Sequence, residues 1–136
     1  MAFMIWTKEL SVSVAVLDED HKKMIDIINE LHDGIIAGHK QEILASVLDQ
    51  LADYTRFHFA REEEFFVQAN YPDVSTHKME HTSFIGRISN LQERFKTASI
   101  VMLDLELMNF LRNWLLIHIQ GSDMKYGPRF NASGIF

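Results

Sequence analysis

Apolar residues recur three or four positions apart along most of the chain, and this spacing predicts amphipathic helices. Short polar segments separate the apolar stretches. Gly38 marks the end of the first stretch and the segment ANYPD the end of the second. Four helices joined by short connections predict an all-α, up-down-up-down four-helix bundle. The expected helices are roughly Asp18–Ala37 with Asp18 as its N-cap, Gln41–Ala69, a third from Ser75 through Phe95, and Val101–Gln120.

The segment before the first helix, MAFMIWTKELSVSVAV, alternates apolar and polar residues. Such alternation is typical of a strand, but a single strand has nothing to pair with in an otherwise helical chain. We therefore expect an extended N-terminal arm that packs on the bundle through Trp6, Leu10 and Val12.

Length and composition limit the classes of protein that fit this chain. With 136 residues, 47% hydrophobic and 24% charged, one domain over residues 1–136 is expected. The formal charge of −6 makes nucleic acid an unsuitable partner. The chain has no cysteine, which excludes disulfides, zinc-thiolate sites and iron–sulfur clusters. Neither a signal peptide nor a membrane-spanning run is recognisable, so a cytoplasmic location is expected.

Polar residues interrupt the apolar stripe of every predicted helix. Residues four apart lie on the same side of a helix, so His58 points the same way as Glu62, and His77 the same way as His81. Each stripe therefore directs nitrogen or oxygen atoms toward the axis of the bundle. The histidines and acidic residue on these stripes are His21, His58, Glu62, His77, His81 and His118.

Each of these motifs alone has an ordinary structural explanation. A single histidine on an apolar stripe is most often a core residue that is hydrogen-bonded to a carbonyl group. Glu63 and Glu64 are expected to form a solvated acidic run, and His32 and His39 to be partly exposed.

The combination instead favours a metal centre, because burial of an isolated carboxylate costs several kcal/mol unless it is compensated. Five histidines and one or two carboxylates exceed the four ligands of one zinc ion. They suit two octahedral first-row metals, and iron accepts both imidazole and carboxylate.

Asp123 follows His118 by five residues and would diverge from it on a regular helix. Gly121 allows the helix to loosen or end, which would bring Asp123 inward. Spacing alone leaves open whether Asp123 is a ligand or a solvated residue beyond the helix.

The chain resembles the hemerythrins, in particular their single-domain bacterial form. The resemblance covers nearly the whole sequence and rests on Trp6 and the segments LSVSVAVLDEDHKKM, HFAREE, YPDVSTHKMEH and WLLIHIQGSDMKY. It implies a centre of two iron ions (Fe2+/Fe3+) with an oxo or hydroxo bridge, in which one iron has three histidine ligands, the other has two, and two carboxylates bridge both. The iron with three histidines would be held by His77, His81 and His118, and the other iron by His21 and His58. The bridging carboxylates would be Glu62 and Asp123.

The resemblance also implies reversible O2 binding, for oxygen storage, delivery or scavenging, rather than enzymatic catalysis. O2 and small anions such as azide are expected at the iron with two histidines, beside Met24, Trp114, Leu115 and Ile119. An O2-consuming enzyme is a possible recipient of the oxygen. The alternatives are an O2- or redox-sensing module and a di-iron enzyme that handles peroxide or nitric oxide.

Two further residues adjoin the implied ligands. Asp20 stands where many bacterial relatives have Gln, and its charge is expected to act on the adjacent His21. Tyr126 follows Asp123 by three residues and is either a hydrogen-bond donor to the centre or a packing residue.

Overall fold

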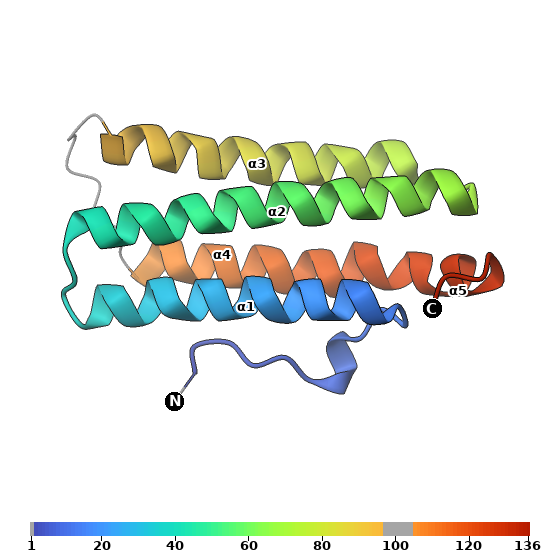
Figure 1. The fold of residues 1–136 in the computed structure, drawn as a ribbon, viewed down its shortest axis with the longest axis horizontal. Coiled ribbons are helices and arrows are strands. Elements are labelled where there is room, and N and C mark those ends of the chain that lie inside the picture. Colours follow the sequence, from blue (N-terminus) through green and yellow to red (C-terminus); the bar gives the residue numbers. More distant parts are fainter. Residues whose placement is uncertain (1, 97–104) are drawn as a thin grey trace.

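The computed structural model describes residues 2–96 and 105–136, and all regular structure within these residues is helical (Figure 1). This confirms the predicted all-α fold, and the second helix has the predicted bounds. Residues 101–104 of the predicted fourth helix lie outside the described residues. The long helices are α1 (Ala15–Ile36), α2 (Gln41–Ala69), α3 (Val74–Lys96) and α4 (Leu105–His118).

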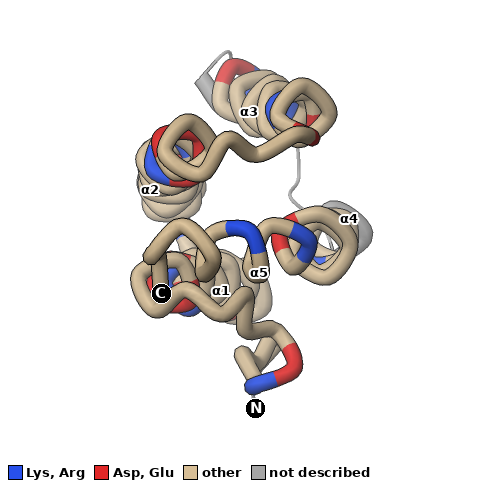
Figure 2. Tube along the Cα trace, turned by 90° about the vertical axis from the view of Figure 1, so that its right-hand side faces the viewer, with Lys and Arg blue, Asp and Glu red and all other residues tan. Residues whose placement is uncertain are grey.

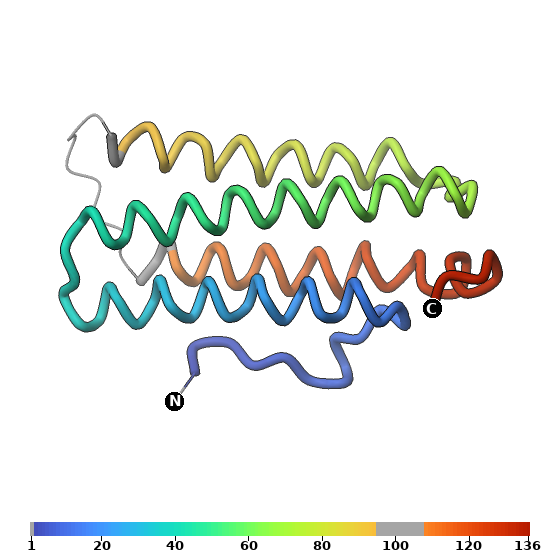
Figure 3. Tube along the Cα trace, viewed as in Figure 1, coloured from blue at the N-terminus to red at the C-terminus, as the bar shows by residue number. Residues whose placement is uncertain are grey.

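Consecutive long helices run in opposite directions, as the colour sequence along the chain shows (Figure 3). The end-on view places the four helices around a common centre (Figure 2). Helix α1 packs against α2 and α4, and α2 packs against α3. The core between them contains fully buried aliphatic side chains such as Leu48, Leu51 and Leu111. The side chains of Phe95 and Leu107, which the periodicity assigns to this core, lie outside the described ones.

Two residues in the left-handed backbone conformation follow the first two helices. Gly38 has a φ of 70° just beyond α1, and Asn70 has a φ of 54° as the C-cap of α2. Both residue types tolerate this conformation, which other residues adopt at a cost. These turns let each helix reverse into the next within a few residues.

The first helix begins three residues before the predicted N-cap, so the prediction for Asp18 was wrong. Asp18 lies inside α1 and accepts hydrogen bonds from the backbone N–H of Val12 at 2.8 Å and the hydroxyl of Ser11 at 2.6 Å. Its carboxylate thus fastens the arm to the helix. Asp18 was expected to accept hydrogen bonds from the helix that follows it, but its partners, Ser11 and Val12, lie in the arm before the helix.

The N-terminal arm packs on the bundle as predicted. Leu10 and Val12 are buried, Trp6 is half-buried, and a short 3-10 turn, η1 (Lys8–Leu10), interrupts the extended segment. A Cβ atom at Gly127 would lie 2.7 Å from the carbonyl oxygen of Val12. Glycine at position 127 therefore allows the arm to approach the C-terminal part of the chain closely.

The C-terminal part continues beyond the predicted four helices. A π-helical turn, η2 (Ile119–Asp123), follows α4 directly and leads into a short fifth helix, α5 (Met124–Ala132). Helix α5 folds back over the end of the bundle near the start of α1 (Figures 1 and 2). None of the described helices is long and apolar enough to cross a membrane.

Candidate metal centre

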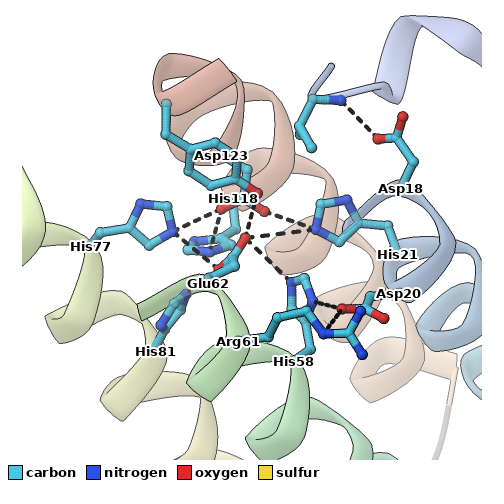
Figure 4. Close-up of polar contacts among 12 residues, drawn as sticks. Asp18, Asp20, His21, His58, Arg61, Glu62, His77, His81, His118 and Asp123 are labelled. Atoms are coloured by element: carbon cyan, nitrogen blue, oxygen red, sulfur yellow. Dashed lines mark hydrogen bonds and ion pairs between the residues drawn. The ribbon is translucent and has the colours of Figure 1, made fainter. Parts of the chain in front are cut away.

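The structure brings all seven predicted ligand side chains together in the middle of the bundle (Figure 4). Each of them is at most 2% exposed. They come from every long helix and from the π-helical turn. In chain order they are His21 on α1, His58 and Glu62 on α2, His77 and His81 on α3, His118 on α4, and Asp123 in η2.

The seven residues form two overlapping groups that share both carboxylates. The two-histidine group consists of His21 and His58 with Glu62 and Asp123; the three-histidine group consists of His77, His81 and His118 with the same two carboxylates. In each group the candidate donor atoms lie within 4.8 Å of one another. This spacing allows one ion to contact all donors of a group.

Glu62 directs one carboxylate oxygen to each group. Its Oε2 lies 3.3 Å from Nε2 of His58 and 4.0 Å from Nε2 of His21. Its Oε1 lies 2.9 Å from Nε2 of His81 and 3.6 Å from Nε2 of His77. The side chain is thus divided between the two groups.

Asp123 is divided in the same way. Its Oδ2 lies 3.1 Å from Nε2 of His21, in the two-histidine group. Its Oδ1 lies 2.8 Å from Nε2 of His77 and 3.0 Å from Nε2 of His118, in the three-histidine group. Two carboxylates that each face two sets of imidazoles have the arrangement expected of bridging ligands.

These short contacts do not satisfy the buried polar atoms. Within the described part of the chain, Nε2 of all five histidines, Oε1 of Glu62 and both oxygens of Asp123 have no hydrogen-bond partner. Buried donors and acceptors without partners are rare and costly in folded proteins. A pair of metal ions would use the lone pairs of these atoms, so the residues fit such a group.

The electrostatics of the centre without metal show how strongly the two kinds of side chain interact. Burial raises the pKa of the Glu62 carboxyl, but the charge of His58 and the nearby His77 and His81 hold it well below its usual value. Burial and the charge of Glu62 raise the pKa of Asp123, whereas His118 and His21 outweigh them and lower it.

The opposite shift appears on the histidines. Burial lowers the pKa of His58, but Glu62, Asp20 and Asp123 raise it to about 10. Burial likewise opposes the effect of Asp123 and Glu62 on His77, whose pKa rises to about 9. With pKa values raised this far, His58 and His77 would carry protons at neutral pH, and a metal would have to displace them on binding.

The π-helical turn explains how Asp123 reaches the centre. A π-helix pairs residue i with residue i+5, so its wider turn places Asp123 on the same side as His118. Of the two outcomes predicted at Gly121, a loosened or an ended helix, the structure shows the loosened one. Helical geometry continues through Gly121 into α5, with one wide turn.

Asp20 contacts a different histidine from the one expected. Its Oδ2 accepts a hydrogen bond from Nδ1 of His58 at 2.9 Å, and its Oδ1 accepts one from the hydroxyl of Tyr54 at 3.0 Å. Nε of Arg61 lies 3.5 Å from the same Oδ2. Burial raises the pKa of Asp20, but His58, Tyr54 and Arg61 together lower it below its usual value. The ligand histidine to which Asp20 is hydrogen-bonded is thus His58, and an effect of its charge on the adjacent His21 stays a prediction.

Two glutamates contact histidines of the three-histidine group from outside. Oε2 of Glu63 lies 3.0 Å from Nδ1 of His81, so the expectation that Glu63 belongs to a solvated run was wrong. Glu64 is exposed, as predicted. Oε1 of Glu80 lies 3.4 Å from Nδ1 of His118, and the hydroxyl of Ser122 donates to Glu80 at 2.7–2.8 Å.

Sequence reasoning missed Glu80 and Ser122, and it placed Tyr54 on the buried stripe of the second helix without a role in the site. Tyr54 precedes His58 by four residues on the same stripe, a spacing that offered a signal. Glu80 lies between His77 and His81, where nothing in the spacing distinguishes it from a surface residue.

Aromatic side chains enclose the three-histidine group. Phe59 stacks on His81 with ring centroids 3.8 Å apart, and Trp114 stacks on His118 at 4.6 Å. The hydroxyl of Tyr126 donates a hydrogen bond of 2.5 Å to Oε2 of Glu62, which settles its role in favour of a donor. Trp114, predicted beside the other iron, thus lies against a histidine of the three-histidine group.

The other predicted pocket residues are buried apolar side chains. Met24 is 1% exposed, Leu115 is 3% exposed and Ile119 is fully buried. They line the same core as the ligands, and their assignment to the O2 position stays a prediction.

Comparison with known proteins agrees with this arrangement. Residues 12–130 match the sequence profile of the hemerythrin HHE cation binding domain. The chain is 37% identical to a bacteriohemerythrin of Methylococcus capsulatus, over 97% of this chain and all of the relative. It is 33% identical to a bacteriohemerythrin of Stenotrophomonas maltophilia, over 97% of this chain and 84% of the relative.

A solved structure gives the same result in three dimensions. The crystal structure of a wild-type hemerythrin superimposes with a TM-score of 0.89 and 34% sequence identity. The superposition covers 95% of this chain and 98% of the other.

Proposed function

The chain belongs to the hemerythrin family, and on that premise we propose that its buried centre holds two iron ions and binds O2 reversibly. One observation supports this most strongly: Glu62 and Asp123 each direct one oxygen to either histidine group. Carboxylates divided in this way match two metals side by side. A single ion would leave one group of buried imidazoles uncompensated.

The ligand sets differ by one histidine. One iron would be held by His77, His81 and His118, and the other by His21 and His58, with both carboxylates common to them. With one bridging oxygen added, three histidines and two carboxylates would fill the six positions of an octahedral iron, whereas two histidines and the same carboxylates would leave one position for an added ligand. Two ferrous ions in this centre would supply the electrons with which O2 binds reversibly.

The chain itself provides the environment that oxygen carriage needs. Met24, Leu115 and Ile119 contribute buried apolar surface to the core of the bundle. A centre surrounded by such side chains excludes bulk water and offers few protons, which protects bound oxygen from further reaction. Tyr126 is the exception, because its hydroxyl reaches Glu62.

We propose oxygen storage or delivery rather than catalysis for the same reason. Among the polar contacts of the described residues, Glu62 and Asp123 meet the ligand histidines and one tyrosine. A catalyst that consumes O2 or peroxide needs a proton donor positioned for each turnover. Azide is expected to occupy the same open position as O2.

The test is a spectroscopic cycle combined with metal analysis. Protein reconstituted with Fe2+ under anaerobic conditions is measured in the visible range before exposure to air, in air, and after O2 removal. We expect two irons per chain, a new absorption band in air, and its loss when O2 is removed. A band that persists after deoxygenation, or one zinc per chain with no iron response, would overturn the proposal.

A further inference from the structure

Asp20 differs from the other acidic residues that contact the histidines from outside. Its side chain is 4% exposed, compared with 32% for Glu63 and 35% for Glu80. It contacts His58 of the two-histidine group, whereas the two glutamates contact histidines of the three-histidine group. The carboxylate behind the two-histidine group is thus buried, whereas those behind the three-histidine group are partly exposed to solvent.

The contact between Asp20 and His58 fixes how the imidazole is oriented. The hydrogen bond of 2.9 Å keeps a proton on Nδ1, so that Nε2, which faces the shared carboxylates, is the nitrogen that would bind the metal. Tyr54 holds the other carboxylate oxygen at 3.0 Å. Partners of this kind fix the tautomer of a ligating histidine and increase its basicity.

Three of the other ligand histidines have weaker or more exposed outer partners. Nδ1 of His21 has no hydrogen-bond partner among the described residues. Nδ1 of His118 lies 3.4 Å from Glu80 without forming a hydrogen bond. Glu63 does contact His81 at 3.0 Å, but it is one-third exposed and also lies 3.8 Å from Nζ of Lys78. Asp20 also has a cation nearby, Arg61 at 3.5 Å, so the difference between the two carboxylates is the solvent that weakens the effect of the Glu63 charge.

From this asymmetry we infer that Asp20 is a positioning residue which holds His58 and makes the two-histidine site the more electron-rich of the two. The inference rests on the proposed di-iron function. A buried negative charge acts through a low effective dielectric and so favours the higher metal charge. Asp20 thereby strengthens metal binding at this site and lowers the reduction potential of the iron that has the open position.

Asp20→Asn separates the charge from the hydrogen bond. The amide oxygen can still accept the proton of His58, while the negative charge is removed. We expect about tenfold weaker binding at one of two Co2+ sites, in line with other outer partners of metal ligands, and a positive shift of the midpoint potential. Chelator competition measures the first quantity and redox titration of the iron-loaded protein the second.

Two further variants keep the test decisive. Glu63→Gln is the matched control on the other group, and we expect it to change both quantities less than Asp20→Asn does. Arg61 lies 3.5 Å from Asp20, so Arg61→Gln exposes the charge and should shift the potential in the negative direction. A residue that only stabilised the fold would not give shifts of opposite sign. Circular dichroism checks that each variant is folded, and Arg61→Gln carries the test if Asp20→Asn is not.

The outcomes distinguish this inference from the proposed function. If the unaltered protein fails to bind two metals, the proposed function fails. If it binds two metals but Asp20→Asn has no greater effect than Glu63→Gln, or Arg61→Gln shifts the potential upward, the role of Asp20 is refuted.

Discussion

The two histidine groups share Glu62 and Asp123 but are constructed differently. The two-histidine group is formed by α1 and α2 and has the buried Asp20 behind it. The three-histidine group is formed by α3 and α4, is enclosed by stacked aromatic rings, and has partly exposed glutamates behind it. The three-histidine group therefore offers one more candidate ligand, whereas the two-histidine group, where we propose the open position, has the more deeply buried outer carboxylate.

This difference indicates a division of roles. A metal with all of its positions filled by protein and bridging atoms is held firmly but has no position for an added ligand. A metal with one position fewer filled can accept O2, and its electron density then depends on the outer partner of its histidine. The predictions below test this division, beginning with the largest expected effect.

Removal of a shared carboxylate should weaken iron binding at both histidine groups, so that they no longer differ. We expect Glu62→Ala and Asp123→Ala each to reduce iron from two ions per chain to less than one, because each side chain faces both groups. Metal analysis after reconstitution measures the loss. Glu64→Ala, at an exposed position of the same helix, is the control and should retain both ions. Retention of two ions in either carboxylate variant would show that the side chains do not bridge.

A smaller apolar side chain near the open position should affect oxidation more than metal binding. Leu115→Ala and Ile119→Ala remove buried volume, so water should enter and speed autoxidation several-fold while iron content is unchanged. The decay of the oxygenated band gives the rate. Ile117, which is 70% exposed on the same helix, provides the control Ile117→Ala. Equal rates in all three variants would place the open position elsewhere.

Without metal, histidines of both groups should make the folded protein less stable at alkaline pH. The pKa of His58 is raised to about 10 and that of His77 to about 9, so their stabilising contribution is complete below their unfolded pKa of 6.5. It is lost as pH rises through the folded values. We expect the melting temperature of the metal-free protein to be lower at pH 9 than at pH 6 by at least about 5 °C.

The metal-loaded protein provides the comparison for this experiment. Its histidines are bound as neutral imidazoles, so its stability should fall much less over the same pH range. A metal-free protein that is equally stable at both pH values would mean that the imidazoles are not protonated against the carboxylates.

The smallest effect is expected from Ser122, which joins the π-helical turn to α3 through Glu80. Ser122→Ala should loosen this connection and weaken metal binding at the three-histidine group a few-fold. The two-histidine group should change less, since neither residue contacts its histidines in the described contacts. Ser122→Thr retains the hydroxyl and should restore binding, as chelator competition would show. Failure of the threonine variant to restore it would point to packing instead of the hydrogen bond.

Helix periodicity predicted the arrangement well where each helix is regular. The second helix was predicted with its observed bounds, and the buried stripe of every helix was identified through its histidines. These features depend on residues three and four positions apart, so they can be recognised from the sequence alone. The end of α1 was marked by Gly38, whose positive φ explains why glycine stands there.

The departures from regular helices were less predictable. Gly121 was compatible with a helix end, yet helical structure continues through η2 and α5, and Gly127 of α5 lies directly against the arm. The partners of His58 and His81 come from neighbouring helices, and their distances depend on how those helices are placed. Asp20 was consequently assigned to its sequence neighbour His21, and Glu63 to solvent.

The most direct test of the division between the two groups is a crystal structure of the iron-loaded protein with azide. Azide is a small anion that takes an open iron position without the redox chemistry of O2. We expect azide on the iron held by His21 and His58, and no added ligand on its neighbour. Azide on the iron held by His77, His81 and His118 would contradict the account.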